Sequence, residues 1–518
     1  MTEHYLDRLA RTITENWDGP ALADFYLNED GTAQDSSRGN HYTYGEMYEE
    51  ILYVCDIFQS LGLQKGDYIA ICGDNSAHWA IAYLAIAAYQ GVVVTILHSQ
   101  SPEDIAHQID FSDARALFTD KDMWEELKEQ SLPQIKHVIN LADWSVLLGK
   151  QIKNQKSKII NRDCHFSTGE PDNLAMICFT SGSTGVSKGV MLPYRSVNAN
   201  NINNVTCDII DDQNGHSMPF LAVLPFAHMY GLMDNLITHV TRGIHIHIAC
   251  GIHTPRKLLC AIDKIRPFGL AITPAILEGL LTSTQKQNNG NWFCGLNYIE
   301  IGGASLSKET ESVVYDEKIP YFSGYGLSEL GPHITSSTNV ARKGSCGTIA
   351  RKMTARIAPN GEILVKGENV MLGYYKDPEA TARKIDSDGW LHTGDKGHLD
   401  EDGYLYVEGR LEQDIIVLPN GENIRPDHIE SLINALPEVT ESIVLARDGR
   451  LVAIVLPSSE SRETSETRAS SPSSSLRRII LRNVNPSLPL FSQLYDVEIT
   501  DTPLARTEKQ TIKRYLYK

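Results

Sequence analysis

Short runs of aliphatic and β-branched residues alternate with longer helical stretches through about the first 320 residues. Strands that are separated by helices are joined by right-handed crossovers, which lay the strands parallel to one another. The pattern therefore predicts an α/β fold with mostly parallel sheets. The runs expected to form strands are Tyr68–Cys72, Val92–Ile96, Ala116–Phe118, His137–Ile139, Ala175–Phe179, Ala222–Leu224, Ile244–Ile248, Gly269–Ile272 and Tyr298–Ile301.

The pattern changes at Tyr321, after which glycine-punctuated strands such as Gly361–Val365 and Tyr404–Val407 follow turn signals. This predicts a β-rich subdomain, an antiparallel sheet or small barrel, over about 321–410. Residues 1–410 are thus expected to form a large N-terminal domain, with α/β subdomains over about 1–320. Residues 411–518 are expected to form a small, mobile α+β domain. A Ser/Thr/Glu tract over about 458–475 has no apolar anchor and is predicted to be a mobile loop.

One apolar stretch, Trp79–Leu97, approaches the length of a membrane span. Its first part is rich in alanine and suits a helix, Gly91 suits the end of that helix, and Val92–Ile96 suits a buried strand. We therefore expect a helix-to-strand connection in an α/β layer and no transmembrane anchor.

The composition limits which binding partners and which cellular compartment are expected. The chain of 518 residues has 47 Lys and Arg against 65 Asp and Glu, a net charge of −18. Nucleic acids and anionic membranes need a positive field, so neither is an expected partner. The nine cysteines are scattered, form no CxxC pair, and predict a reduced, cytoplasmic protein. The N-terminus lacks the apolar run of a signal peptide and predicts an amphipathic helix.

The strongest local signal for chemistry is the segment from Thr180 to Gly189, which directly follows the apolar run Ala175–Phe179. Glycine and hydroxyl residues after a strand offer backbone N–H groups and hydroxyls to a phosphate, and a lysine adds charge. The spacing differs from a Walker A loop, which needs GxxxxGK[ST]. The residues expected to bind phosphate are Thr180, Ser181, Gly182, Ser183, Thr184, Gly185 and Lys188.

This segment resembles the first core motif of the AMP-forming acyl-CoA synthetases, in the adenylate-forming superfamily, except that Ser187 stands where proline is usual. Further family motifs follow in order along the chain. They are LPFAHMYG (Leu224–Gly231), Gly302–Ser305, GYGLSE (Gly324–Glu329), Gly361–Thr381, GWLHTGD (Gly389–Asp395) and Gly409-Arg410. The resemblance is strong from Leu174 to Arg410.

The resemblance implies an enzyme that uses ATP, Mg²⁺ and CoA. A carboxylate attacks the α-phosphate of ATP to give an acyl adenylate, and a thiol then attacks that adenylate. It implies catalytic roles for His228, Ser328 and Glu329, with Glu329 also holding Mg²⁺. The other residues implied to bind the nucleotide are Gly303, Ala304, Ser305, Tyr325, Gly326, Asp395 and Arg410.

A catalytic lysine near the C-terminus is also implied by the resemblance. Counting from Pro503 along the family motif selects Lys509, whereas counting back from the Ile-Lys-Arg ending places Thr511 at that position. We assign the role to Lys509. The C-terminal domain is expected to rotate about a hinge just after Arg410 and so present Lys509 for adenylation.

The substrate expected from the same resemblance is a fatty acid, giving acyl-CoA, AMP and pyrophosphate. A fatty acyl-AMP ligase that delivers the acyl group to an acyl carrier protein is a second hypothesis. A degenerate nucleotide-binding module without turnover is a third, supported by the irregular sequence around Lys509.

Two other patterns suggest metal binding but are discounted. His245 and His247 would point to the same face of a strand, with His253 nearby, yet no Cys, Asp or Glu stands at ligand spacing. Asp211-Asp212 is expected to be a solvated loop.

Overall fold

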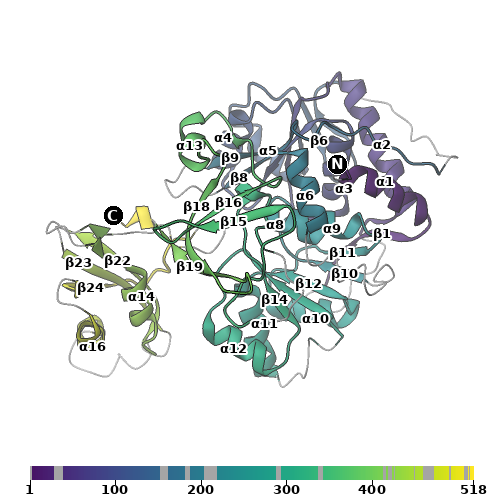
Figure 1. The fold of residues 1–518 in the computed structure, drawn as a ribbon. Helices are drawn as coiled ribbons and strands as arrows, with labels where there is room; N and C mark the ends of the chain where they lie inside the picture. The colour runs from purple at the N-terminus through teal and green to yellow at the C-terminus, as the bar shows by residue number, and fades with distance from the viewer. Residues whose placement is uncertain are drawn as a thin grey trace. The chain divides into compact units, whose positions relative to one another are not determined.

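The structure, a computed structural model, divides into two units by its internal contacts (Figure 1). The first unit comprises Met1–Thr180 and Ser187–Glu408, and the second comprises Ser181–Val186 and Gly409–Lys518. The residues that the structure describes are 3–28, 39–151, 162–180, 187–203, 219–287, 293, 295–335, 342–411, 416–417, 423–424, 426–447, 450–458, 472–488, 492–506, 512 and 514–517.

The largest sheet of the first unit has eight strands in the order β17-β9-β8-β4-β3-β5-β6-β7. Its central strands, from β8 to β6, are parallel, while β7, β9 and β17 pair with their neighbours antiparallel. The strands are β3 (Tyr68–Cys72), β4 (Val92–Ile96), β5 (Ala116–Thr119), β6 (His137–Asn140), β7 (Val146–Leu148), β8 (Leu174–Thr180), β9 (Lys188–Pro193) and β17 (Gly373–Tyr374).

Two smaller sheets complete the α/β part. In the order β10-β11-β1-β2, the first three strands run parallel and β2 is antiparallel, whereas β12-β13-β14 is wholly parallel. The α/β class with mostly parallel sheets is therefore confirmed. The strands are β1 (Pro20–Phe25), β2 (His41–Thr43), β10 (Pro219–Ala222), β11 (His245–Ala249), β12 (Gly269–Ile272), β13 (Tyr298–Ile301) and β14 (Tyr321–Ser323).

The β-rich region after β14 forms a four-stranded sheet in the order β15-β16-β18-β19. Strand β16 pairs antiparallel with both β15 and β18. The strands are β15 (Met353–Ile357), β16 (Glu362–Gly367), β18 (Leu391–Leu399) and β19 (Leu405–Arg410).

Helices pack on these sheets, and Figure 1 shows α10, α11 and α12 around β12 and β14. Side-chain caps start many of them: Thr43 and Glu46 form a capping box at α2, and Ser76 caps α3. The helices are α1 (Tyr5–Glu15), α2 (Tyr44–Leu61), α3 (Ala77–Ala88), α4 (Pro102–Phe111), α5 (Lys121–Leu127), α6 (Tyr194–Asn203), α8 (Met229–Leu232), α9 (Thr238–Val240), α10 (Pro255–Ile265), α11 (Pro274–Gln287), α12 (Lys308–Asp316) and α13 (Pro378–Lys384), with the π-helix η3 (Met233–Ile237) and the 3₁₀ turn η4 (Ser328–Leu330).

The apolar stretch Trp79–Leu97 forms the core of this unit. All twelve residues of α3 are buried, and β4 is buried along its whole length. A helix that is apolar on every side is stable where protein surrounds it. The helix ends at Ala88 with Tyr89 as its C-cap, two residues before the expected cap at Gly91, and Gln90 takes the left-handed conformation (φ 60°). In the part of the chain that the structure describes, no helix is long and apolar enough to span a bilayer.

The second unit has an α+β core of its own. Strand β22 pairs antiparallel with β23, which pairs parallel with β24. Buried residues of these strands pack with α14 and α16. Helix α16 begins at Pro472, so the last residues of the predicted 458–475 loop are helical, while 459–471 lie outside the described residues. The elements are β20 (Ile416–Val417), β21 (Asn423–Ile424), α14 (Pro426–Asn434), β22 (Val439–Arg447), β23 (Arg450–Pro457), α16 (Pro472–Val484), β24 (Asp496–Ile499) and the 3₁₀ turns η6 (Asn485–Ser487) and η8 (Arg514–Leu516).

One predicted strand, Ala222–Leu224, was misplaced. Strand β10 ends at Ala222 because the next two backbone N–H groups bond to the side chain of Asn235 and not to a neighbouring strand. Its Oδ1 accepts hydrogen bonds from the N–H of Val223 (2.8 Å) and of Leu224 (3.1 Å). The chain therefore leaves the strand just before the LPFAHMYG segment.

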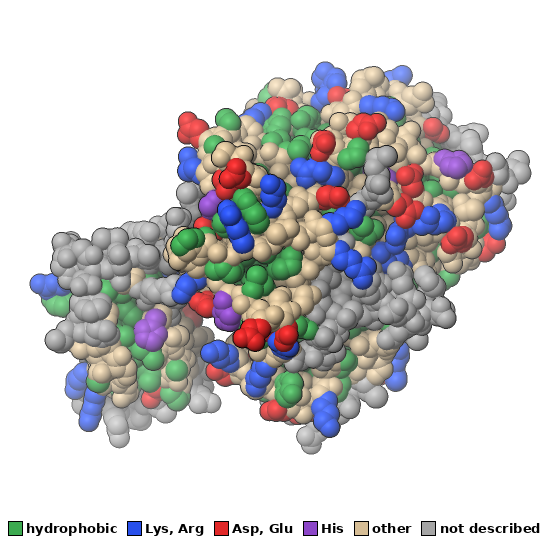
Figure 2. Space-filling model, in the orientation of Figure 1, with side chains coloured by type: hydrophobic (Ala, Val, Ile, Leu, Met, Phe, Trp, Pro, Cys, Tyr) green, Lys and Arg blue, Asp and Glu red, His purple; other side chains and the backbone are tan. Residues whose placement is uncertain are grey.

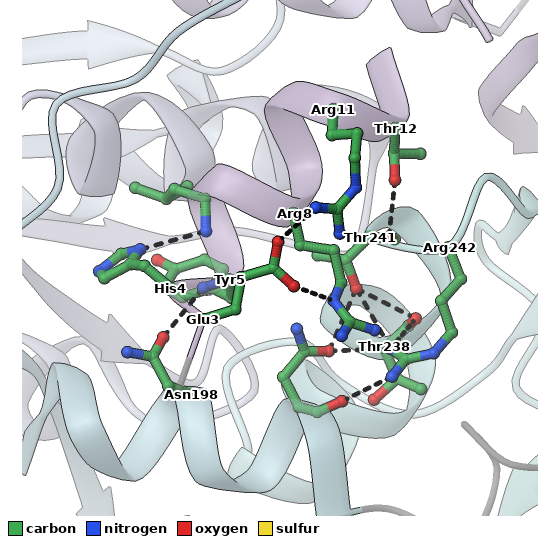
Figure 3. Close-up of polar contacts among 12 residues, drawn as sticks. Glu3, His4, Tyr5, Arg8, Arg11, Thr12, Asn198, Thr238, Thr241 and Arg242 are labelled. Carbon is green, nitrogen blue, oxygen red and sulfur yellow. Dashed lines mark hydrogen bonds and ion pairs between the residues drawn. The ribbon is translucent and has the colours of Figure 1, made fainter. Parts of the chain in front are cut away.

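The surface of the first unit carries both signs of charge. Figure 2 shows Lys and Arg side chains interspersed with Asp and Glu side chains over its visible face. Around α1, the arginines Arg8 and Arg11 pair with Glu3, and the backbone N–H of Tyr5 donates to Asn198 (Figure 3). The ion pairs hold Glu3 against α1, and the Tyr5–Asn198 hydrogen bond attaches this helix to α6.

Candidate active site

The predicted phosphate loop connects β8 to β9. Thr180 ends β8 and Lys188 begins β9, and the two residues are register partners in the antiparallel pair. The Thr180 hydroxyl donates to the Lys188 carbonyl at 3.5 Å. The five loop residues Ser181–Gly185 lie outside the described residues. The structure thus places the start of the loop at the end of a buried strand, as the sequence predicts, and places Lys188 in a following strand that the sequence did not predict.

Tyr325 and Asp395 come from distant segments and meet directly. The Tyr325 hydroxyl donates to Asp395 Oδ2 at 2.5 Å, and Asp395 is buried within β18. The backbone N–H of Tyr325 donates to Thr335 Oγ1 (2.9 Å), and that of Asp395 to Thr393 Oγ1 (3.0 Å). Each residue is therefore fixed by a hydrogen bond from its backbone N–H as well as by the bond between the two side chains.

Glu329 lies in η4 and forms a second polar chain with Tyr374 and Lys188. The Tyr374 hydroxyl donates to Glu329 Oε1 at 2.7 Å, and Lys188 Nζ lies over the Tyr374 ring, 4.9 Å from its centroid. Glu329 and Lys188 are half-buried. Ser328, also half-buried, precedes Glu329 in the same turn. Sequence analysis assigned no role to Tyr374, although it stands in the family segment Gly361–Thr381. We call these two groupings, Tyr325–Asp395 and Glu329–Tyr374–Lys188, the nucleotide-site contacts.

The glycine segment after β13 packs against Tyr230. A Cβ built on Gly302 would lie 3.0 Å from the Tyr230 ring, and Gly303 has a φ of +81°. Both positions therefore favour glycine, one for space and one for backbone conformation. Gly303, Ala304 and Ser305 are exposed, so their backbone is accessible to a ligand.

His228 is the residue before α8, two positions from Tyr230, and is half-buried. Gly326 is exposed and forms a backbone bridge with His333. A Cβ on Gly326 would lie 2.0 Å from the Pro332 carbonyl oxygen, so only glycine fits this hairpin. Arg410 ends β19 and is exposed, in the second unit. Lys509 lies outside the described residues.

A further polar group was missed by sequence analysis. Asp234 of η3, Glu300 of β13 and His333 are all buried, and one ligand atom from each lies within 4.8 Å of the others. His333 Nε2 is 3.0 Å from both carboxylate oxygens of Asp234. We call these three residues the buried charge cluster. The only sequence signal for it is an acid inside each of two apolar runs, LMDNLI and YIEI.

The two carboxylates of this cluster determine the protonation state of His333. Burial alone would lower the pKa of His333, but the charge of Asp234, its hydrogen bond and the charge of Glu300 together raise that pKa to about 9. His333 is therefore protonated at neutral pH. By contrast, burial lowers the pKa of His245 to about 4 and that of His247 to about 3, so both are neutral. Their rings lie 4.2 Å apart on one side of β11.

Comparison with protein families agrees with this geometry. The AMP-binding enzyme family matches residues 16–375, and the C-terminal domain of AMP-binding enzymes matches residues 413–517. The fold and these family matches thus define an adenylate-forming ligase of the acyl- and aryl-CoA ligase superfamily. The chain belongs to the AMP-binding enzyme family, whose ligases use ATP and CoA as substrates.

Several curated proteins are similar over most of their length. "Probable CoA ligase CCL5" of Humulus lupulus is 27% identical over 437 residues, covering 79% of this chain and 77% of the relative. "Peroxisomal OPC-8:0-CoA ligase 1" of Arabidopsis thaliana is 26% identical, with 79% and 77% covered. "4-coumarate--CoA ligase CCL1" of Humulus lupulus is 27% identical, with 83% and 82% covered.

Solved structures share the fold over nearly the whole chain. ATP-bound MatB from Rhodopseudomonas palustris superposes with a TM-score of 0.77 at 22% identity, covering 99% of this chain and 98% of that one. The Mycobacterium tuberculosis fatty acyl CoA synthetase gives a TM-score of 0.68 at 21% identity, covering 99% and 97%. At these identities the similarity establishes the fold alone.

Proposed function

We propose that this protein activates a carboxylic acid with ATP, as an acyl adenylate, and transfers the acyl group to CoA with release of AMP and pyrophosphate. The observation that carries the proposal is the convergence of Tyr325 with Asp395 and of Glu329 with Lys188, from segments far apart in the sequence. Relatives named as CoA ligases support the acceptor.

The nucleotide would be held by groups suited to its parts. Asp395 is an acceptor-only carboxylate, which suits a pair of ribose hydroxyls, and Tyr325 fixes its orientation. Lys188 and the backbone of the β8–β9 loop suit the phosphates. The exposed backbone of Gly303–Ser305 suits the adenine, and Arg410 the ribose. Because these groups are already ordered before ATP binds, less conformational entropy is lost on binding.

A Mg²⁺ ion fits Glu329. Mg²⁺ prefers oxygen ligands and is usually bound by one or two carboxylates together with substrate phosphates. The Glu329 carboxylate is half-buried, oriented by Tyr374 at 2.7 Å, and connected through that ring to Lys188. The ion would neutralise phosphate charge while Glu329 holds it. Ser328 would add a hydroxyl beside it, and Lys509 would bring a positive charge to the α-phosphate and the acyl oxygen.

The acid we propose first is a fatty acid, with His228 near its carboxylate. Support comes from the sequence resemblance and from a structural neighbour that is a fatty acyl CoA synthetase. The relatives' names include 4-coumarate and OPC-8:0, so these two acids belong in the same test. We place the reaction in the cytoplasm, which the buried thiols of Cys72, Cys164 and Cys250 suit because disulfides are rare there.

Pyrophosphate release from ATP tests this proposal, measured with a series of straight-chain fatty acids and with 4-coumarate, each with and without CoA. Mass analysis of the product identifies the acyl acceptor. An acyl-CoA that forms only with CoA supports the ligase. Accumulated acyl adenylate without acyl-CoA favours transfer to an acyl carrier protein, and ATP binding without pyrophosphate release favours the degenerate module.

A further inference from the structure

We propose that Asn75 and Asn235 are positioning residues for acid activation, because their side-chain amides fix the backbone that places His228 in the active site. This inference rests on the proposed function, in which His228 lies near the carboxylate of the acid. Sequence analysis assigned no role to either asparagine. Both would act on the reaction only through the segment that contains His228.

The backbone between β10 and α8 is held by two side-chain amides. Asn75 Nδ2 donates to the Leu224 carbonyl at 2.7 Å, and its Oδ1 accepts from the Phe226 N–H at 2.8 Å. One amide thus supplies the donor and the acceptor that a paired strand would otherwise supply. Asn235 Oδ1 accepts from the N–H groups of Val223 (2.8 Å) and Leu224 (3.1 Å). The segment is therefore fixed without a β-ladder.

The backbone around Asn75 is itself fixed by the neighbouring sheet. Asn75 lies between β3 and α3 and is half-buried. Its carbonyl accepts from Cys250 Sγ at 3.4 Å, and the Ala77 N–H donates to Asp24 Oδ1 of β1 at 2.7 Å. Asn75 thus joins the carboxyl end of β3, in the largest sheet, to the sheet that contains β1, β10 and β11. The carboxyl ends of parallel strands are where α/β proteins bind their ligands.

The held segment continues directly into His228. The Pro225 carbonyl lies between the two groups that Asn75 binds, and it accepts from the His228 N–H at 3.1 Å. A Cβ built on Gly231 would lie 2.0 Å from the Pro225 carbonyl oxygen, so the first turn of α8 packs closely on Pro225. The Leu232 N–H in turn donates to the His228 carbonyl at 2.7 Å. A displacement of Pro225 would therefore displace His228.

Asn235 fixes the same segment from its other end. It is fully buried in η3, which directly follows α8. Asn235 follows His228 in the chain, whereas Val223 and Leu224 precede it, so one side chain closes the loop that contains His228. The π-helical form of η3 is rare and is frequently found at functional sites. Hydrogen bonds therefore restrain the backbone on both sides of His228.

A purely structural role is the competing explanation, because buried backbone groups need partners throughout a fold. Asn140 provides the comparison. It ends β6 in the same sheet as β3, its Oδ1 accepts from the Ala142 N–H (3.1 Å), and its Nδ2 donates to Asp143 Oδ1 (2.9 Å). Asn75 differs because the segment that it holds leads to a proposed catalytic side chain. An effect that depends on His228 therefore separates positioning from structural support.

The test is a double-mutant cycle in the full-length protein. Pyrophosphate release with the best acid of the series gives kcat/KM for the wild type, Asn75→Ala, His228→Ala and the double variant. We expect Asn75→Ala to lower kcat/KM about 10- to 100-fold, since a displacement of about 1 Å can cost as much as 100-fold. In the His228→Ala background the same change should cost less than about threefold, because residues that act as a unit are not additive.

Matched variants and a binding measurement accompany the cycle. Asn75→Asp keeps the shape and the acceptor but sets a carboxylate against the Leu224 carbonyl, so it should lose activity as Asn75→Ala does. Asn235→Ala should cause a loss that also depends on His228. Asn140→Ala removes comparable side-chain hydrogen bonds and should keep full activity. The calorimetric affinity for ATP should stay within about twofold in every variant, because the nucleotide-site contacts lie on other segments.

A loss of kcat/KM that depends on His228, with ATP affinity intact, supports the inference. An equal loss in the His228→Ala background, or a matching loss of ATP affinity, makes the asparagines structural and overturns it. Full activity of both Asn75 variants, failure of both to fold by circular dichroism, or full activity of His228→Ala also overturns it. In these cases an active wild type leaves the proposed ligase standing. Activation of no acid by the wild type overturns the proposed function and the inference together.

Discussion

The nucleotide-site contacts and the buried charge cluster are two polar groupings in the same unit, built in opposite ways. Glu329, Lys188 and Tyr325 are half-buried, whereas Asp395 and Tyr374 beside them are buried. Water therefore screens the charges of Glu329 and Lys188, which can exchange partners with a ligand. Asp234, Glu300 and His333 are shielded from water, where charges interact strongly and stay paired. The first arrangement suits reversible binding of a charged nucleotide. The second suits a contact that stabilises the folded chain.

The largest expected effect separates binding from chemistry. Lys509→Ala should reduce the adenylation rate by about 10²–10³, the usual cost of losing one preorganised charge at a transition state. The affinity for ATP should change little, because the nucleotide-site contacts remain. Single-turnover pyrophosphate release and calorimetric ATP titration measure the two quantities. Thr511→Ala is the matched control, and a larger rate loss in that variant would move the catalytic position to the alternative register.

The buried charge cluster should dominate the pH dependence of stability on the alkaline side. The pKa of His333 is raised from its ordinary value of 6.5 to about 9, so its contribution is complete below pH 6.5 and is lost as pH rises through 9. At about 1.4 kcal/mol per pKa unit, this is on the order of 3 kcal/mol of unfolding free energy. Asp234→Asn should flatten this loss.

Tryptophan fluorescence can follow this transition in urea at pH 6 and pH 9.5. All six tryptophans precede residue 409, so the signal reports on the first unit. Comparing the wild type with Asp234→Asn cancels the groups that titrate in both. If the unfolding free energy varied identically with pH in the two proteins, the Asp234–His333 pair would contribute nothing to stability. The buried charge cluster would then not differ from the nucleotide-site contacts in this respect.

Sequence reasoning predicts most residues of the nucleotide-site contacts, Tyr374 excepted, because the resemblance assigns a role to one residue in each motif. The order of the motifs along the chain selects Tyr325, Glu329 and Asp395 as candidates. It could not reveal that Tyr325 bonds to Asp395, because their separation in space depends on how β18 packs. The predicted α/β strands lie where their apolar runs place them, except at Val223 and Leu224, where a side chain eleven or more residues away replaces the backbone ladder. Strands such as β1 and β9 were not predicted.

The buried charge cluster was beyond the same reasoning. Its members are 66 and 33 residues apart, and no motif links Asp234 to Glu300 or to His333. An acid within an apolar run could signal a strand edge, a turn or a buried partner, and periodicity does not distinguish these. Only the convergence of η3, β13 and the hairpin after η4 shows that the acids are paired.

Asp395→Asn should affect ATP binding without the stability loss expected for the cluster. A hydrogen bond to a charged group is worth about 1.5–3 kcal/mol, which corresponds to roughly a 10- to 100-fold weaker affinity for ATP. Calorimetry measures the dissociation constant. Tyr325→Phe and the double variant complete a cycle, and fully additive effects would indicate that Tyr325 does not orient Asp395.

The smallest expected effect concerns Tyr374, which sequence analysis did not assign. Tyr374→Phe removes the hydroxyl that donates to Glu329 and keeps the ring beneath Lys188. One hydrogen bond is worth about 1 kcal/mol, so the Mg²⁺ concentration for half-maximal activity should rise about fivefold. The unfolding free energy should fall by no more than about 1 kcal/mol, because the half-buried Glu329 carboxylate keeps access to water. A large loss of stability with unchanged Mg²⁺ dependence would instead make Tyr374 structural, and Glu329 would then need another partner to orient it.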